Sequence, residues 1–125
     1  MPRETVVARE YDTALAVCAE ALARARLHNS VPAVAGSLDT LGFIDHRTRH
    51  HRRAVIRHRR AVDLFRSFGG IAGAVGALEH LGHAHSALGE RELARSAWLE
   101  AIDLYRQMRR DTEVRRMQDQ IDGLD

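Results

Sequence analysis

Along the chain, residues suited to the buried face of a helix recur at helical spacing. Turn residues separate the segments in which they recur. In the segment that starts at Ala54, the positions expected to face inward fall at i, i+4, i+7, i+8 and i+11, which is one face of a helix. Gly69-Gly70 and Gly89 lie between such segments and end one helix before the next begins. The pattern predicts an all-α fold. The expected helices span residues 10–28, 31–47, 51–67, 71–88, 91–108 and 111–123.

The pattern repeats after 40 residues. Shifted by this amount, Leu38-x-x-Leu41-Gly42 falls on Leu78-x-x-Leu81-Gly82. Between residues 36 and 66 this register gives nine identities without a gap, where chance would give about two. The repeat predicts antiparallel helical hairpins stacked in an array. We expect a frayed N-terminus or the remnant of a missing helix at 1–9, a partial repeat at 10–30, full repeats at 31–70 and 71–110, and a capping helix at 111–125.

The partial repeat carries an apolar face that lacks a full partner helix. Leu15, Val17 and Leu22 belong to this face. An apolar face without a partner favours association between chains, so we expect that this segment can self-associate.

Composition narrows the chemistry that the chain can perform. All 19 basic residues are arginine, which excludes every mechanism that needs lysine, such as a Schiff base or a P-loop. The single cysteine, Cys18, lies on the inward side of its segment and is expected to be an inert buried thiol. No Ser-His-Asp or paired-carboxylate arrangement can be inferred, so we expect neither an enzyme nor a cofactor. One cysteine, no apolar leader and no membrane-length apolar run favour a cytoplasmic protein that does not enter a membrane.

One stretch of the chain resembles a tetratricopeptide repeat (TPR). It runs Leu78-x-x-Leu81-Gly82-x-x-His85, then Gly89, Ala94-x-x-x-Trp98 and Ala101. The family pattern asks for Leu-Gly, then a tyrosine, and later an alanine and an aromatic residue. Here His85 replaces the tyrosine and Trp98 is the aromatic residue. The first full repeat departs further, with Asp45 for the tyrosine and His58 for the aromatic residue. The resemblance implies a right-handed, TPR-like superhelix of about six helices with a concave groove.

The long repeat and the segments 81–89, 101–105 and 111–115 are similar to the C-terminal array of large actinobacterial regulators of the Streptomyces antibiotic regulatory protein type. This resemblance implies a non-catalytic binding or sensor module of a transcriptional regulator of antibiotic biosynthesis. A protein, a peptide or a small ligand would occupy the groove and alter how the array packs against a partner, such as another domain of the same regulator. A stand-alone scaffold protein is an alternative.

Carried over from the family, outward positions of the first helix in each hairpin line the groove. A mixture of charged and aromatic side chains there suits a peptide or a small ligand, whereas an ordinary solvated face is the alternative. The positions are Asp39, Phe43, His46 and Arg47 in the first full repeat, and Glu79, His83 and Ser86 in the second.

A basic run from Arg47 to Arg66 contains eight arginines and one acid, Asp63, a local charge of +7. Such a run favours a module that docks nucleic acid or an acidic partner surface, which is the alternative function. No aromatic residues interleave for base stacking and no helix-turn-helix signature accompanies the run, so we do not expect this segment to bind nucleic acid. The basic patch comprises Arg49, Arg52, Arg53, Arg57, Arg59 and Arg60.

Histidine spacing does not predict a metal site. His46 and His50 are four residues apart and His80 and His83 are three apart, so each pair can share a helix face. No third ligand follows at a reliable spacing, and no H-E-x-x-H motif occurs. The histidines at inward repeat positions, His58 and His85, are expected to pack or to form hydrogen bonds.

Overall fold

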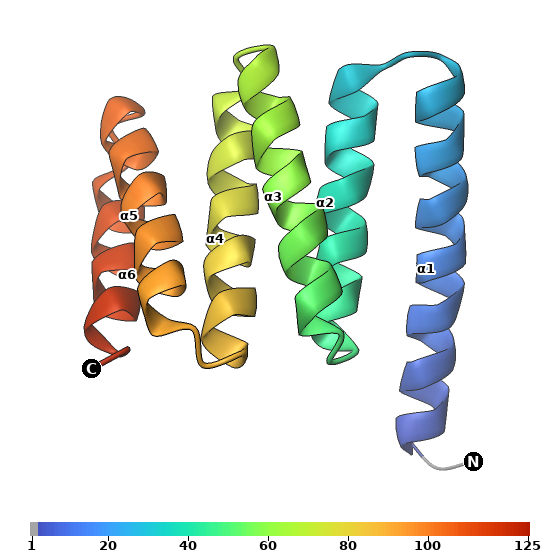
Figure 1. Ribbon diagram of the computed structural model, residues 1–125, viewed down its shortest axis with the longest axis horizontal. Coiled ribbons are helices and arrows are strands. Elements are labelled where there is room, and N and C mark those ends of the chain that lie inside the picture. Colours follow the sequence, from blue (N-terminus) through green and yellow to red (C-terminus); the bar gives the residue numbers. More distant parts are fainter. Residues whose placement is uncertain (1–2) are drawn as a thin grey trace.

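Antiparallel helices make up the part of the chain that the structure describes (Figure 1). The computed structural model describes the backbone of residues 3–125 and the side chains of residues 6–125. No strand occurs among these residues, which confirms the predicted all-α repeat fold, and none of their helices is both long and apolar enough to cross a membrane. The helices are α1 (Arg3–Leu27), α2 (Val31–Arg47), α3 (His51–Ser67), α4 (Ile71–Ala87), α5 (Arg91–Gln107) and α6 (Asp111–Asp122).

The first helix begins earlier than the sequence pattern predicts. Residues 3–9, expected to be a frayed segment or the remnant of a missing helix, belong to α1. Residues 1–2 lie outside the described part of the chain. Neither glycine nor proline occurs between Arg3 and Leu27, so no residue interrupts the helix over this length.

Each helix packs against the next one along the chain, and α2 also packs against α4. In the view of Figure 1, α3 lies in front of α4 and α5 lies in front of α6. We call α2, α4 and α6 the A helices, because α2 and α4 open the two full hairpins and α6 follows in the same register. Their outward surface is called the A-helix face, and α3 and α5 are called the B helices.

The same turn follows each of the first five helices. At each turn an N–H donates to the carbonyl five residues back, as from His50 to the Asp45 carbonyl (2.7 Å) and from Gly70 to the Phe65 carbonyl (2.8 Å). This bond is the mark of a Schellman motif, which needs a left-handed residue just before the donor. The left-handed residues are Asn29, Arg49, Gly69, Gly89 and Arg109. They recur every 20 residues, so the backbone repeats with half the period of the sequence.

A ring from the B helix lies directly over the glycine of Leu41-Gly42 and of Leu81-Gly82. A Cβ atom added to Gly82 would lie 2.1 Å from Nε1 of Trp98, and one added to Gly42 would lie 2.7 Å from Cε1 of His58. Both rings are buried, as the repeat pattern predicts. The equivalent residue of α1 is Cys18, which is partly buried rather than fully buried as expected, because no A helix precedes α1 among the described residues.

The helix α1 leaves part of its surface open. Ala21 matches Ala61 in the repeat register, yet Ala61 is fully buried and Ala21 is exposed. Of the face predicted to self-associate, Leu22 is buried, Leu15 is partly buried against the core, and Val17 is 60% exposed. Val17 and Ala21 are therefore the residues through which self-association, which stays a prediction, would occur.

We expect the substitution Gly82→Ala to destabilise the protein by about 1–3 kcal/mol, because the new methyl group overlaps the buried indole of Trp98. The matched control is Gly76→Ala on the same helix, where no atom lies within 4 Å of the added Cβ. This control should be up to about 1 kcal/mol more stable than wild type, because alanine favours the helix. Chemical denaturation of both variants measures the difference, and equal effects of the two substitutions would contradict the close approach.

Candidate binding face

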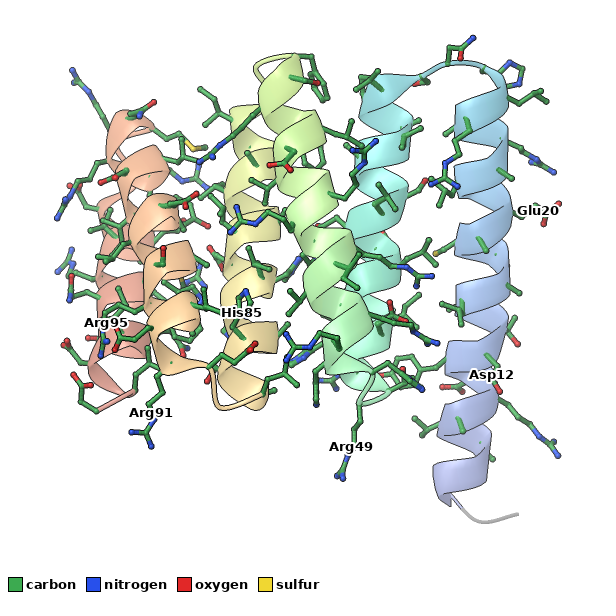
Figure 2. All side chains as sticks on the ribbon, in the orientation of Figure 1. Asp12, Glu20, Arg49, His85, Arg91 and Arg95 are labelled. Carbon is green, nitrogen blue, oxygen red and sulfur yellow. The ribbon has the colours of Figure 1, made fainter. Side chains whose placement is uncertain are left out.

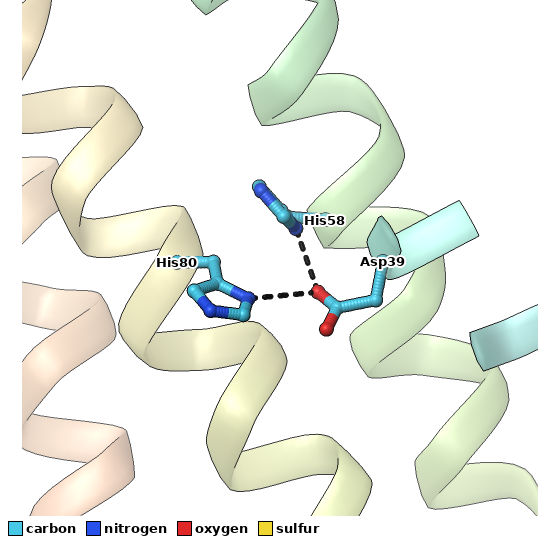
Figure 3. A group of neighbouring side chains, drawn as sticks. All are labelled: Asp39, His58 and His80. Carbon is cyan, nitrogen blue, oxygen red and sulfur yellow. Dashed lines mark hydrogen bonds and ion pairs between the residues drawn. The ribbon is translucent and has the colours of Figure 1, made fainter. Parts of the chain in front are cut away.

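A carboxylate on α2 holds three consecutive helices together. Oδ1 of Asp39 lies 2.7 Å from Nδ1 of His58 on α3 and 3.2 Å from Nδ1 of His80 on α4 (Figure 3). Burial alone would raise the pKa of Asp39, but the hydrogen bonds from the two imidazoles outweigh this effect and lower the pKa to about 2. The hydrogen bond to Asp39 raises the pKa of His80, against the opposing effect of burial. Asp39 is therefore ionised, and its Oδ1 binds two other helices of the array.

Glu79 is the equivalent of Asp39 in the second repeat, and it joins α4, α5 and α6 in the same way. Arg116 donates two hydrogen bonds of 2.9 Å to its carboxylate, and the hydroxyl of Tyr105 donates a third. Burial opposes the ionised form, but the hydrogen bonds from Arg116 and Tyr105 lower the pKa of Glu79. One acid per repeat thus links an A helix to the following B helix and to the next A helix.

These contacts revise the role of two predicted groove residues. Asp39 and Glu79 lie on A helices, as expected, but internal hydrogen bonds occupy both oxygens of Glu79 and Oδ1 of Asp39. A ligand would have to compete with these bonds for those three oxygens. We therefore assign both acids to the framework of the A-helix face, and the remaining predicted residues to its surface.

Aromatic and imidazole side chains occupy the middle of the A-helix face. Phe43 is 44% exposed, and its ring centroid lies 5.7 Å from that of His80. The ring of His83 meets Trp98 edge-on at a centroid distance of 5.3 Å. Burial lowers the pKa of His83, so its imidazole is predominantly neutral at pH 7 and can both donate and accept a hydrogen bond.

His46 and Arg47 lie at the end of α2, beside α1. The Nδ1 atoms of His46 and His51 are 2.9 Å apart, so one donates to the other, and Nε of Arg47 donates to the hydroxyl of Tyr11 (3.3 Å). Burial and the charges of neighbouring histidines, including His83, lower the pKa of His46. The charges of His46 and His83 thus influence each other, so the two side chains belong to the same surface. A hollow of about 390 Å³ lies at this place. It is lined by His46, Arg47, His51 and Tyr11, together with Val7 and Arg49.

Ser86 lies apart from these residues. It lines a second hollow of about 220 Å³, between the end of α4 and the end of α6. Trp98, Asp119 and Gln120 contribute to the same hollow. Of the predicted groove residues, His46 and Arg47 thus line one hollow and Ser86 lines another.

Much of the predicted basic patch forms ion pairs within the fold. Arg53 and Arg57 bind the two carboxylate oxygens of Asp45, at 3.1 Å and 2.7 Å, and Asp45 is fully buried. Arg52 donates two bonds of 3.2 Å to Glu90, at the start of the following B helix. These three arginines therefore compensate acids inside the array and between its repeats.

The other arginines of the patch are exposed. Arg49, Arg59 and Arg60 form no ion pair with any residue that the structure describes. Figure 2 shows Arg49 pointing away from the array at the turn before α3. The patch that a partner can reach is therefore smaller than the sequence predicts, because acids distant in the sequence neutralise half of it.

The contacts between histidines differ from the pairs that spacing along one helix suggested. His46 contacts His51, not His50, while Nδ1 of His50 lies 2.9 Å from the hydroxyl of Thr48. The inward position of His58 is confirmed, and its partner Asp39 lies on the preceding helix. His85, also buried as expected, hydrogen-bonds to Glu90 across the next turn.

Sequence spacing missed the closest set of metal-ligating atoms. One atom from each of Asp39, His58 and His80 lies within 4.8 Å of the other two. These residues come from three different helices, so no spacing within one helix could indicate the set. Only the inward position of His58 and the outward position of Asp39 were visible in the repeat.

Comparison with known proteins adds no family assignment. No protein-family model matches the chain, and the search of curated proteins finds no match. The relation to tetratricopeptide repeats and to antibiotic regulators therefore stays a prediction from the sequence pattern.

Replacing Arg57 by alanine should destabilise the protein by about 1–3 kcal/mol, because the buried Asp45 loses the closer of its two partners. The matched control is Arg59→Ala on the exposed side of the same helix, which should change stability by less than about 0.5 kcal/mol. Urea unfolding of the two variants separates structural arginines from surface ones. If both variants lost the same stability, the assignment of Arg57 to the fold would be wrong.

Burial and the neighbouring carboxylate of Glu79 raise the pKa of Tyr105 to about 12. The protonated hydroxyl thus stabilises the folded state fully below the ordinary tyrosine pKa of about 10, and this contribution disappears as pH rises towards 12. Glu79→Gln should lower the pKa of Tyr105, because the negative charge that opposes the tyrosinate is gone. Absorbance titration of tyrosinate measures the shift, with Tyr105→Phe to identify the signal. A wild-type Tyr105 that titrates near 10 would refute the contact.

Proposed function

We propose that the chain is a non-catalytic binding module that holds an extended segment of a partner protein on the A-helix face. The exposed ring of Phe43 supports this proposal most directly. A large apolar side chain that is 44% exposed, beside partly buried polar groups, is typical of an anchor point in an interface. Phe43, His46 and Arg47 stand at i, i+3 and i+4 on α2, so they face the same partner.

The chemistry of the face indicates what the segment contains. Arg116 and the two imidazoles bound to Glu79 and Asp39 offset the negative charge at these positions, so the face does not favour a cationic partner there. The hollow at the end of α2 is lined by two arginines and two imidazoles, together with Tyr11 and Val7, and guanidinium and imidazole groups donate hydrogen bonds to carboxylates. An apolar residue over Phe43, followed by an acidic residue in the hollow, is therefore the partner motif that we propose.

The resemblance to actinobacterial antibiotic regulators suggests where such a module acts. We place it in a transcriptional regulator, in which the bound segment belongs to another domain of that regulator or to a separate protein. Binding would then favour one packing of the array over another, because a ligand shifts an equilibrium by its difference in affinity for the two states.

Selection from a random peptide library on the full chain tests the proposal. We expect enriched peptides that combine an apolar and an acidic residue, and that bind Phe43→Ala at least about tenfold more weakly than wild type. The matched control is Leu93→Ala, an exposed apolar residue of comparable size on the B helix α5, which should bind the peptides as wild type does.

Two results would contradict this function. Peptides that lose affinity equally with Leu93→Ala would show that binding is not specific to the A-helix face. Absence of enriched peptides, together with DNA binding that weakens steeply with salt and with Arg59→Ser, would favour the arginine-rich helix as a dock for nucleic acid.

A further inference from the structure

The group Asp39, His58 and His80 combines ligands that one metal ion can share. Its three ligand atoms, one carboxylate oxygen and two imidazole nitrogens, lie within 4.8 Å of one another. Figure 3 shows both imidazoles directed at the same carboxylate from α3 and α4. Two histidines and one carboxylate are a ligand set that zinc, cobalt, nickel and ferrous ions accept, with water or a further ligand completing the coordination.

The two distances from Asp39 are close to those that a metal ion requires. Metal–ligand bonds of about 2.0–2.1 Å at tetrahedral angles place the ligand atoms roughly 3.3 Å apart. Oδ1 of Asp39 is 3.2 Å from Nδ1 of His80 and 2.7 Å from Nδ1 of His58. The two imidazole nitrogens lie within 4.8 Å of each other, so a shared ion requires the shorter distance to open by about half an ångström and the two nitrogens to reach a similar spacing.

The group is only partly buried. Its ligands are therefore partly preorganised, and a metal ion can still reach them from solvent. The side chain of His58 is fully buried, whereas those of Asp39 and His80 are 20% and 36% exposed. An ion can therefore enter from the A-helix face and find the third ligand already in place behind it. The other nearby acid, Glu79, is held by Arg116 and does not compete for the ion.

The second nitrogen of His58 limits the affinity. Nε2 of His58 is buried and has no hydrogen-bond partner among the described residues. A metal ion on Nδ1 leaves the imidazole proton on Nε2, where no acceptor receives it. The site should consequently bind more weakly than a structural zinc site with four protein ligands.

We propose that Asp39, His58 and His80 form a binding site for a divalent transition-metal ion of the zinc class. The ion displaces the Nδ1 protons that now bind Asp39 and joins α2, α3 and α4 through one centre. This site departs from the sequence-based expectation of no metal. The proposal does not rest on peptide binding, but both occur on one face, where His80 contacts Phe43.

Cobalt titration of the full, untagged chain, followed by competition with zinc, tests the proposal. The visible absorption of cobalt reports coordination by the protein, and calorimetry with zinc counts the ions bound. We expect wild type to bind one ion more than His80→Ala, and Asp39→Asn to bind that ion at least about tenfold more weakly. Zinc should also raise the melting temperature of wild type and not that of His80→Ala.

Two controls keep the result specific. His46→Ala removes the neighbouring histidine pair, and His28→Ala removes an exposed histidine at the end of α1. Both should retain the ion that His80→Ala loses. His80 is partly exposed, so its variant should fold, and circular dichroism verifies this. Equal numbers of ions on wild type and His80→Ala, or loss of the same ion in His46→Ala, would overturn the proposal.

Discussion

The structure depends on the close approach between each A helix and the B helix that follows it. This approach occurs at the glycines of the two Leu-Gly pairs, where a side chain as small as alanine would overlap a buried ring. With the helices this close, the indole of Trp98 reaches the carbonyl of Glu79 at 3.2 Å, and the imidazole of His58 reaches Asp39 at 2.7 Å. The close approach of the two helices thus produces both the packing of the buried rings and their hydrogen bonds.

The two repeats use the same backbone position for different chemistry. Asp39 meets two imidazoles, whereas Glu79 meets a phenol and a guanidinium. A guanidinium stays charged throughout the physiological pH range, so the second contact is a permanent ion pair. Imidazoles can bind metal ions, which a guanidinium does not, so the first contact can respond to its surroundings. In both repeats the acid therefore links an A helix to the following B helix and the next A helix, but the chemical properties of its partners differ.

The candidate binding face was partly predictable. The register placed Phe43, His46 and His83 on A helices, because an outward position in one repeat is outward in the next. It could not show that internal bonds occupy Asp39 and Glu79, because the partners come from helices that are neighbours only after folding. The basic patch illustrates the same limit: charge along the sequence is a local property, whereas the pairing of Arg57 with the buried Asp45 is a spatial one.

The sequence by itself determined the helices and their register. Apolar spacing, the Leu-Gly pairs and the glycines of two turns sufficed, because they act between residues that are close along the chain. Tertiary structure alone decided which polar groups meet. It also decided that Arg49 and Arg109 adopt the left-handed turn that glycine adopts elsewhere. The physical reason is that hydrogen bonds and ion pairs need partners within about 3 Å, and the stacking of helices, not the sequence spacing, sets those distances.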